Sequence, residues 1–206
     1  TTYSKAWVKE YSDSIIITKK WMSAADYFNK GIKYLIDYYE SNKPFQDNTV
    51  ALEKEIIVSL SDEHQLRGFI DRLVYDKEND EYEIHDYKTS ETAPSQETIE
   101  KDTQLALYSL AIKDLFKHEK QVKMVWHFLS FNKEIELKKT NEQLAFLKQS
   151  TLDLISEIES TLEFPPTISA LCNWCEYKEI CPAWKENNAN GNQSDRYNKR
   201  YGQQKL

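Results

Sequence analysis

Three strand-like segments follow one another without an intervening helix, and this run constrains the fold more than any other feature. They cover residues 51–60 (ALEKEIIVSL), 65–75 (QLRGFIDRLVY) and the first part of 81–90 (EYEIHDYKTS). The polar stretch DKEND separates the last two segments, so they are expected to form a hairpin. A chain with this run is expected to bury one face of a sheet against helices.

Helical periodicity brackets these strands. Ser23 and Asp26 resemble a capping box at the start of a helix that ends before 42–47, and helices are predicted at 99–116 and 141–160. Segment 122–131 is strongly β-prone, and 135–139 is a candidate neighbour for it. The order favours an α/β fold, with a mixed central β-sheet flanked by helices.

Length and composition suit one globular domain with a small appendage. With 206 residues and 40% hydrophobic residues, the chain is expected to divide into a core at 1–163, a cysteine segment at 164–185 and a flexible polar tail at 186–206. The sequence opens without a methionine, and we expect that elements upstream of residue 1 are not included in it. No apolar run reaches the ~20 residues of a membrane span, and no signal peptide is visible, so a cytoplasmic location is expected.

The charge balance gives a mild argument against a nucleic-acid partner. The net charge is −7 and the pI about 5.3, whereas phosphate binding favours a basic surface. However, a metal-dependent nuclease also clusters acids around its cations, so the balance does not exclude one.

Asp86 and Lys88 end the third segment one residue apart. Strand periodicity places them on one face with Tyr82 and Ile84, either as a surface ion pair or as part of an active site. A hairpin would bring Asp71 to the same place.

Carboxylates on the first segment, Glu53 and Glu55, are both candidates for a third acid. Such oxygens suit Mg²⁺ or Mn²⁺, which polarises a phosphoryl oxygen and activates water. Lys88 would then orient or deprotonate that water.

Three further residues belong to this hypothesis. Gly68 interrupts a strand, which a closely approaching substrate backbone would explain. Gln104 and Tyr108 lie one helical turn apart and are candidates for contacting a phosphate or a base. The histidines are expected to be ordinary polar or packing residues.

The ordered triple GFID (68–71), HDYKT (85–89) and QLALY (104–108) resembles the PD-(D/E)XK nucleases, in particular the RecB-like exonuclease branch. The resemblance implies a restriction-endonuclease-like core and a metal-dependent nuclease, expected to be a DNA exonuclease in repair, recombination or phage and defence DNA processing. It implies that Asp71, Asp86 and the Tyr87 carbonyl bind the metal and that Lys88 positions the nucleophilic water. Gln104 and Tyr108 would hold the DNA strand. The histidine that many members carry on an earlier helix has no counterpart before His64.

The cysteines Cys172, Cys175 and Cys181 form a C-x2-C-x5-C pattern. An odd, clustered set is not a disulfide framework and indicates zinc or an iron–sulfur cluster. The resemblance implies three of the four ligands of a structural [4Fe–4S] cluster, but this chain contains no upstream cysteine to supply the fourth.

Two other functions stay open. The chain is alternatively a catalytically silent nuclease-fold module that binds DNA or acts as a scaffold in a helicase–nuclease assembly. RNA is a less favoured substrate. DNA and a helicase or other repair proteins are therefore the expected partners.

Overall fold

A computed structural model describes residues 2–17, 19, 21–92, 95–117 and 120–189. The chain forms two compact units, Thr1–Ile155 and Ser156–Leu206. The predicted tail lies largely outside the described residues.

The first unit is built on a five-stranded sheet of order β1-β2-β3-β4-β5. The strands are β1 Thr49–Ser59, β2 Gln65–Asp76, β3 Glu81–Lys88, β4 Lys123–Phe128 and β5 Lys133–Lys138. Only β3 and β4 pair in parallel, and the other neighbours are antiparallel. The expected α/β fold with a mixed sheet and the expected hairpin are therefore confirmed.

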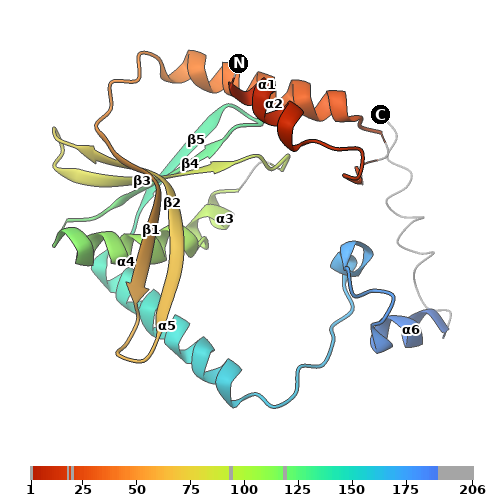
Figure 1. Ribbon diagram of the computed structural model, residues 1–206. Helices are drawn as coiled ribbons and strands as arrows, with labels where there is room; N and C mark the ends of the chain where they lie inside the picture. The colour runs from red at the N-terminus through yellow and green to blue at the C-terminus, as the bar shows by residue number, and fades with distance from the viewer. Residues whose placement is uncertain (1, 18, 20, 93–94, 118–119, 190–206) are drawn as a thin grey trace. The chain divides into compact units, whose positions relative to one another are not determined.

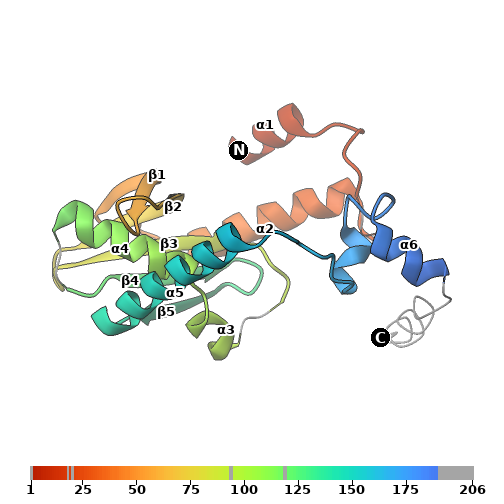
Figure 2. The same ribbon diagram turned by 90° about the horizontal axis from the view of Figure 1, so that it is seen from below.

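Helices cover both faces of this sheet. α2 (Ala24–Asn42) lies on one side, and α4 (Gln104–Phe116) and α5 (Asn141–Ser160) lie on the other (Figure 1). The core lies on the α4 side, where the strands contribute Ile56, Ile84 and Trp126 and α4 contributes Leu105 and Ile112. The parallel β3–β4 pair needs a crossover, and α3 (Gln96–Glu100) and α4 provide it (Figure 2).

The predicted capping box at α2 is present. The Asp26 backbone N–H donates to Ser23 Oγ at 3.2 Å, and the Ser23 backbone N–H donates to Asp26 Oδ2 at 2.7 Å. The reciprocal bonds satisfy two otherwise unpaired amides, which explains why the helix begins here.

The prediction of a single helix over 99–116 is wrong, because α3 ends at Glu100 and α4 begins at Gln104. Asp102 lies in the break, and its Oδ1 accepts a hydrogen bond from the Gln104 backbone N–H at 2.9 Å. The break therefore places Gln104 in the first turn of a new helix. β4 is also shorter than the β-prone run, because a turn begins after Phe128.

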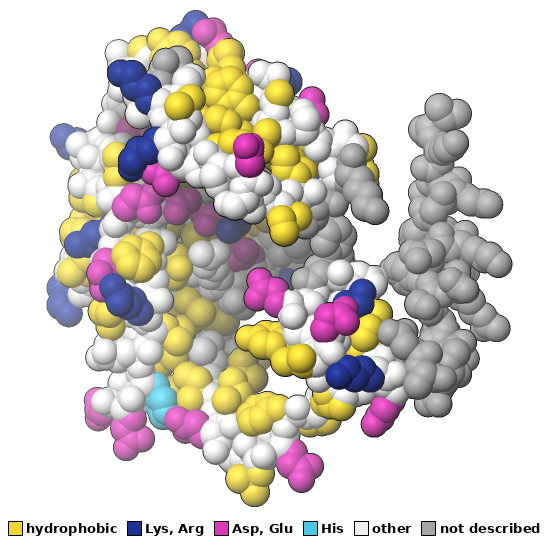
Figure 3. All heavy atoms as spheres, turned by 45° about the vertical axis from the view of Figure 1, so that its right-hand side comes forward, with side chains coloured by type: hydrophobic (Ala, Val, Ile, Leu, Met, Phe, Trp, Pro, Cys, Tyr) yellow, Lys and Arg dark blue, Asp and Glu magenta, His cyan; other side chains and the backbone are white. Residues whose placement is uncertain are grey.

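Helix α1 (Thr2–Glu10), which was not predicted from the sequence, packs on α2 through aromatic rings. Tyr3 stacks on Phe28 with centroids 5.5 Å apart, and an added Cβ at Gly31 would lie 2.1 Å from Tyr3 Oη. Nearby, Trp7, Tyr11 and neighbouring residues line an apolar hollow of about 420 Å³. Apolar side chains also reach the surface at the top of Figure 3.

The second unit begins within α5 and contains η1 (Ala170–Trp174) and α6 (Pro182–Ala189). Among the described residues, no helix combines the length and the apolar character needed to cross a bilayer.

Candidate active site

The candidate site lies where the β2–β3 ladder stops. The last paired residues at this end of the antiparallel ladder are Arg72 and His85. The next residue beyond this pair is Asp71 on β2 and Asp86 on β3. Beyond it, the Tyr87 backbone N–H donates to the Asp71 side chain, at 2.9 Å from Oδ2. The Asp71 carboxylate thus takes the place of a ladder hydrogen bond, and the backbone of β3 is tied to the first candidate metal ligand.

Asp86 and Lys88 form a direct ion pair beside Asp71. Lys88 Nζ lies 3.0 Å from Asp86 Oδ1, to which it donates a hydrogen bond, and 2.8 Å from Oδ2. The Oδ2 atom is buried and has no hydrogen-bond partner among the described residues. Its close contact with the Lys88 ammonium is an ion pair, which leaves a lone pair of this buried carboxylate available to a cation, and this is the observation that best fits a cation site.

Burial raises the pKa of Asp86, which is 8% exposed. The hydrogen bond and charge of Lys88 act in the opposite direction, and the negative charges of Asp71 and Asp102 raise this pKa further. The carboxylate is therefore held in a site that disfavours its charge until a cation compensates for it.

Lys88 is also held from the helix side. Its Nζ donates to Gln104 Oε1 at 3.2 Å, and Gln104 Nε2 donates to the Tyr108 hydroxyl at 3.3 Å. Gln104 and Tyr108 therefore share the predicted face of α4, and the chain of contacts runs from Tyr108 to Asp86. The break before α4 makes this possible, since it starts the helix beside Lys88.

Tyr108 also explains Gly68. A Cβ added to Gly68 would lie 2.4 Å from Tyr108 Cε1 and 2.6 Å from its hydroxyl oxygen. The ring fills the space that a side chain would need, so this contact is sufficient to account for the glycine.

The two candidate glutamates of β1 differ in position. Glu55 is exposed and pairs with Arg67, with 2.9 Å between the carboxylate oxygen and the guanidinium Nε. Glu53 lies between Leu52 and Lys54, which pair with Arg72 and Ile70, and is thus opposite Asp71. Its φ of 47° is unusual for a residue with a side chain inside a strand. Neither glutamate joins a group of three close metal-ligand side chains in the described part of the chain.

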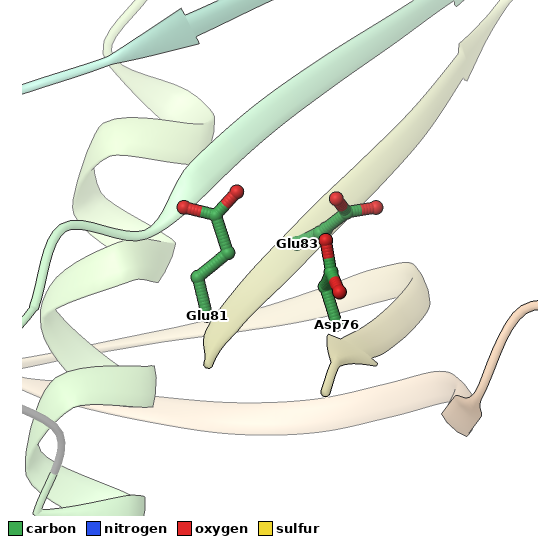
Figure 4. Close-up of side chains that lie close together, drawn as sticks. All are labelled: Asp76, Glu81 and Glu83. Atoms are coloured by element: carbon green, nitrogen blue, oxygen red, sulfur yellow. The ribbon is translucent and has the colours of Figure 1, made fainter. Parts of the chain in front are cut away.

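A different acidic group does meet that criterion. Oxygens of Asp76, Glu81 and Glu83 lie within 4.8 Å of one another at the turn end of the β2–β3 hairpin (Figure 4). Each has structural partners: Asp76 accepts from the Glu78 and Asn79 amides, Glu81 pairs with Lys138, and Glu83 pairs with Lys123 and His85. Burial alone would raise the pKa of Glu83, but the hydrogen bonds from His85 and Lys123 hold it below its ordinary value. This group is a set of compensated charges.

The three cysteines are free thiols in the second unit. Cys172 Sγ accepts from the Ser169 backbone N–H at 3.4 Å, and the Cys181 N–H donates to the Tyr177 carbonyl at 2.9 Å. Among described residues, their sulfurs do not form a group within 4.8 Å, although four thiolates on one zinc ion would lie about 4 Å apart. The described geometry therefore does not fit a preformed zinc site.

Two buried residues on the opposite face of the same strands, Arg72 and His85, were not among the predicted site residues, and His85 was expected to be an ordinary polar or packing residue. Arg72 follows Asp71, His85 precedes Asp86, and both are buried. Their position beside the acids, with opposite side-chain direction, was a signal available from strand periodicity.

A buried carboxylate, a second aspartate and a backbone carbonyl are hard oxygen donors, so these residues fit a divalent cation such as Mg²⁺ or Mn²⁺. When bound, such an ion polarises a phosphoryl oxygen and lowers the pKa of coordinated water.

Comparison with known proteins identifies the family. No curated protein matches the chain. A protein solved as "Crystal structure of SSO0001" is 20% identical, covers 78% of this chain and 72% of its own, and superposes with a TM-score of 0.45. The pattern of the PD-(D/E)XK nuclease superfamily, whose members are generally metal-dependent nucleases, matches residues 2–182. The chain therefore belongs to the PD-(D/E)XK nuclease superfamily.

Proposed function

We propose that the protein is a divalent-metal-dependent deoxyribonuclease of the RecB-like branch, acting as an exonuclease on DNA ends or single strands. The observation that carries this proposal is the meeting of Asp71, Asp86 and Lys88 where the β2–β3 ladder ends. A setting in DNA repair, recombination or defence, with a helicase as partner, belongs to the same proposal.

Each residue has a distinct role in this proposal. Asp71, Asp86 and the Tyr87 carbonyl hold the cation. Lys88, which lies beside Asp86 and is steadied by Gln104, orients the attacking water and offsets charge on the phosphate. Gln104 and Tyr108 also offer an amide and a phenol to the DNA strand.

Glu53 is the better candidate for a third carboxylate. It lies opposite Asp71 in the β1–β2 register, and its left-handed backbone is the kind of local strain that persists at functional sites. Glu55 is instead engaged by Arg67.

The test uses Asp86→Asn and Lys88→Met, with Asp76→Asn as a matched control on β2. Linear and circular DNA, single- and double-stranded, are incubated with Mn²⁺ or Mg²⁺, and RNA serves as the competing substrate. We expect wild type and Asp76→Asn to degrade linear DNA, and both site variants to lose activity by at least about 10²-fold. Intact circular DNA would support exonuclease action.

Other outcomes would change the assignment. Full activity in both site variants would refute the proposed chemistry. Wild-type protein that binds DNA without cutting it, in either metal, would favour the silent scaffolding module. Faster degradation of RNA than of DNA by the wild-type protein would make RNA the substrate.

The cysteine segment carries a separate proposal, that Cys172, Cys175 and Cys181 supply three ligands of a structural [4Fe–4S] cluster. Its support is the clustering of three free thiols and their spacing. Iron analysis and visible absorption of protein purified without oxygen test it, and iron-free protein of unchanged stability would refute it.

A further inference from the structure

A buried polar cluster lies behind the candidate site, on the face of the sheet that carries α2. Its central members are Arg72 of β2, His85 of β3 and His127 of β4, which are 9%, 5% and 4% exposed. Strand alternation places Arg72 and His85 next to Asp71 and Asp86 in sequence but on the opposite face.

The cluster bridges three strands. Arg72 Nη2 donates to His85 Nδ1 at 3.0 Å across the last registered β2–β3 pair, and His127 Nε2 lies 2.8 Å from the same His85 atom. Arg72 Nη1 also donates to Asp47 Oδ2 at 2.7 Å. The cluster therefore joins β2, β3 and β4, with Arg72 opposite His85 in the β2–β3 register and His127 opposite Tyr87 in the β3–β4 register.

The hydrogen bonds define the state of His85. Arginine only donates, so His85 Nδ1 is the acceptor and its Nε2–H donates to Glu83 at 3.1 Å. The His85 ring therefore contacts Glu83 through Nε2, while Arg72 and His127 both approach Nδ1.

Tyr87 connects this cluster to the site. Its ring stacks on His127, with centroids 4.8 Å apart and planes 17° from parallel, and its hydroxyl shares a 2.9 Å hydrogen bond with the Tyr38 hydroxyl of α2. Its backbone N–H binds Asp71. One residue is therefore fixed from both faces of the sheet.

We propose that Arg72, His85 and His127 are positioning residues, which act through Tyr87 and Asp71 to hold the metal ligands at their binding separation. This inference rests on the proposed function. A purely stabilising role explains the cluster less well, because burying a charged guanidinium whose Nε has no partner among described residues is costly compared with apolar packing. Partners behind metal ligands commonly change metal affinity or activity by about 10–100-fold when mutated.

The test compares Arg72→Lys and Tyr38→Phe with Val125→Ala. Lysine keeps the charge of Arg72 but cannot bridge Asp47 and His85 together, and Tyr38→Phe removes only the hydroxyl bound to Tyr87. Val125 is fully buried and opposite His85 on β4, so Val125→Ala weakens the same region without removing a hydrogen bond.

Mn²⁺ binding is measured by electron paramagnetic resonance, and the Mn²⁺ dependence of DNA cleavage is measured in parallel. We expect Arg72→Lys to raise both the Mn²⁺ dissociation constant and the half-saturating Mn²⁺ concentration about 10–100-fold. Its cleavage rate should largely recover at saturating Mn²⁺. Tyr38→Phe should show a smaller rise, and Val125→Ala should lower the melting temperature while keeping wild-type Mn²⁺ affinity.

The possible failures are distinct. If wild type neither binds Mn²⁺ nor cuts nucleic acid, the proposed function fails and this inference falls with it. If wild type does both, but folded Arg72→Lys and Tyr38→Phe bind Mn²⁺ as wild type does, only the positioning role is overturned. A loss of Mn²⁺ affinity in Val125→Ala equal to that in Arg72→Lys would also overturn the positioning role. If Arg72→Lys does not fold, the Mn²⁺ affinity of Tyr38→Phe alone decides.

Discussion

The contact between Gly68 and Tyr108 makes a quantitative prediction. A Cβ at position 68 would lie 2.4 Å from Tyr108 Cε1 and 2.7 Å from Cζ. Carbon atoms in favourable contact are about 3.5–4.0 Å apart, so the ring must move by roughly 1 Å. Such overpacking costs about 1–3 kcal/mol, whereas alanine is intrinsically better than glycine in a strand by about 0.5–1 kcal/mol.

The net of these two effects is a loss of about 0–2.5 kcal/mol, so we expect Gly68→Ala to lower the free energy of unfolding by about 1 kcal/mol, and the melting temperature by about 2–4 °C per kcal/mol. In a Tyr108→Ala background the clash is absent, and the same change should stabilise the protein by about 0.5–1 kcal/mol. Urea unfolding of the four proteins measures the coupling energy directly.

The same displacement should disturb the site. The Tyr108 hydroxyl bonds Gln104, which bonds Lys88, so a moved ring releases the lysine from the helix side. Gly68→Ala should consequently reduce nuclease activity more than it reduces the folded fraction. A Gly68→Ala change of equal free energy in both backgrounds would refute this account of the glycine.

Three further predictions concern the charge of Asp86, stabilisation by Mn²⁺ and the Ser23 cap. Burial raises the folded-state pKa of Asp86, so the Asp86 charge destabilises the metal-free fold above that pKa, and this penalty disappears as the pH falls towards the ordinary pKa of an aspartate. Asp86→Asn should therefore raise the melting temperature at neutral pH but not at low pH. A lower melting temperature of Asp86→Asn at neutral pH would contradict this. Mn²⁺ should stabilise wild type, by about 2.7 kcal/mol at a hundred times its dissociation constant, and leave Asp86→Asn unchanged in the same thermal scan. Ser23→Ala removes the cap of α2 and should cost about 1 kcal/mol in urea unfolding without changing Mn²⁺ affinity, whereas an unchanged unfolding energy would show that the cap contributes nothing.

Local patterns predicted much of the first unit. The hairpin follows from two alternating strands around a polar turn, and the start of α2 follows from Ser23 and Asp26, since each depends on residues close in sequence. The two aspartates and Lys88 were predicted for the same reason, because their faces follow from strand periodicity. The contact partner of each of these side chains was harder to predict from the sequence.

Features that depend on distant residues were missed. The ring that occupies the space at Gly68 comes from Tyr108, and the ring that stacks on Tyr87 comes from His127. Neither pairing can be read from hydrophobic periodicity, because the parallel β3–β4 register sets the second and the α4 position sets the first. The break before α4 was missed because Asp102 resembles an exposed helical residue in the sequence, and only the folded chain shows its carboxylate accepting from the Gln104 backbone N–H.

β3 joins two chemically different surfaces through one backbone. Asp86 and Lys88 point to the α4 side. His85, which precedes Asp86, and Tyr87, which lies between the two, are held on the α2 side. Because a strand residue cannot shift without moving its neighbours, restraint of Tyr87 by Tyr38 and His127 also restrains the Asp86 carboxylate and the Lys88 ammonium. The negative charges of Asp71 and Asp86 repel each other when no cation is bound, so such restraint opposes the separation of the two carboxylates. The polar cluster behind the sheet therefore has a physical reason to exist that neither the core nor the site alone provides.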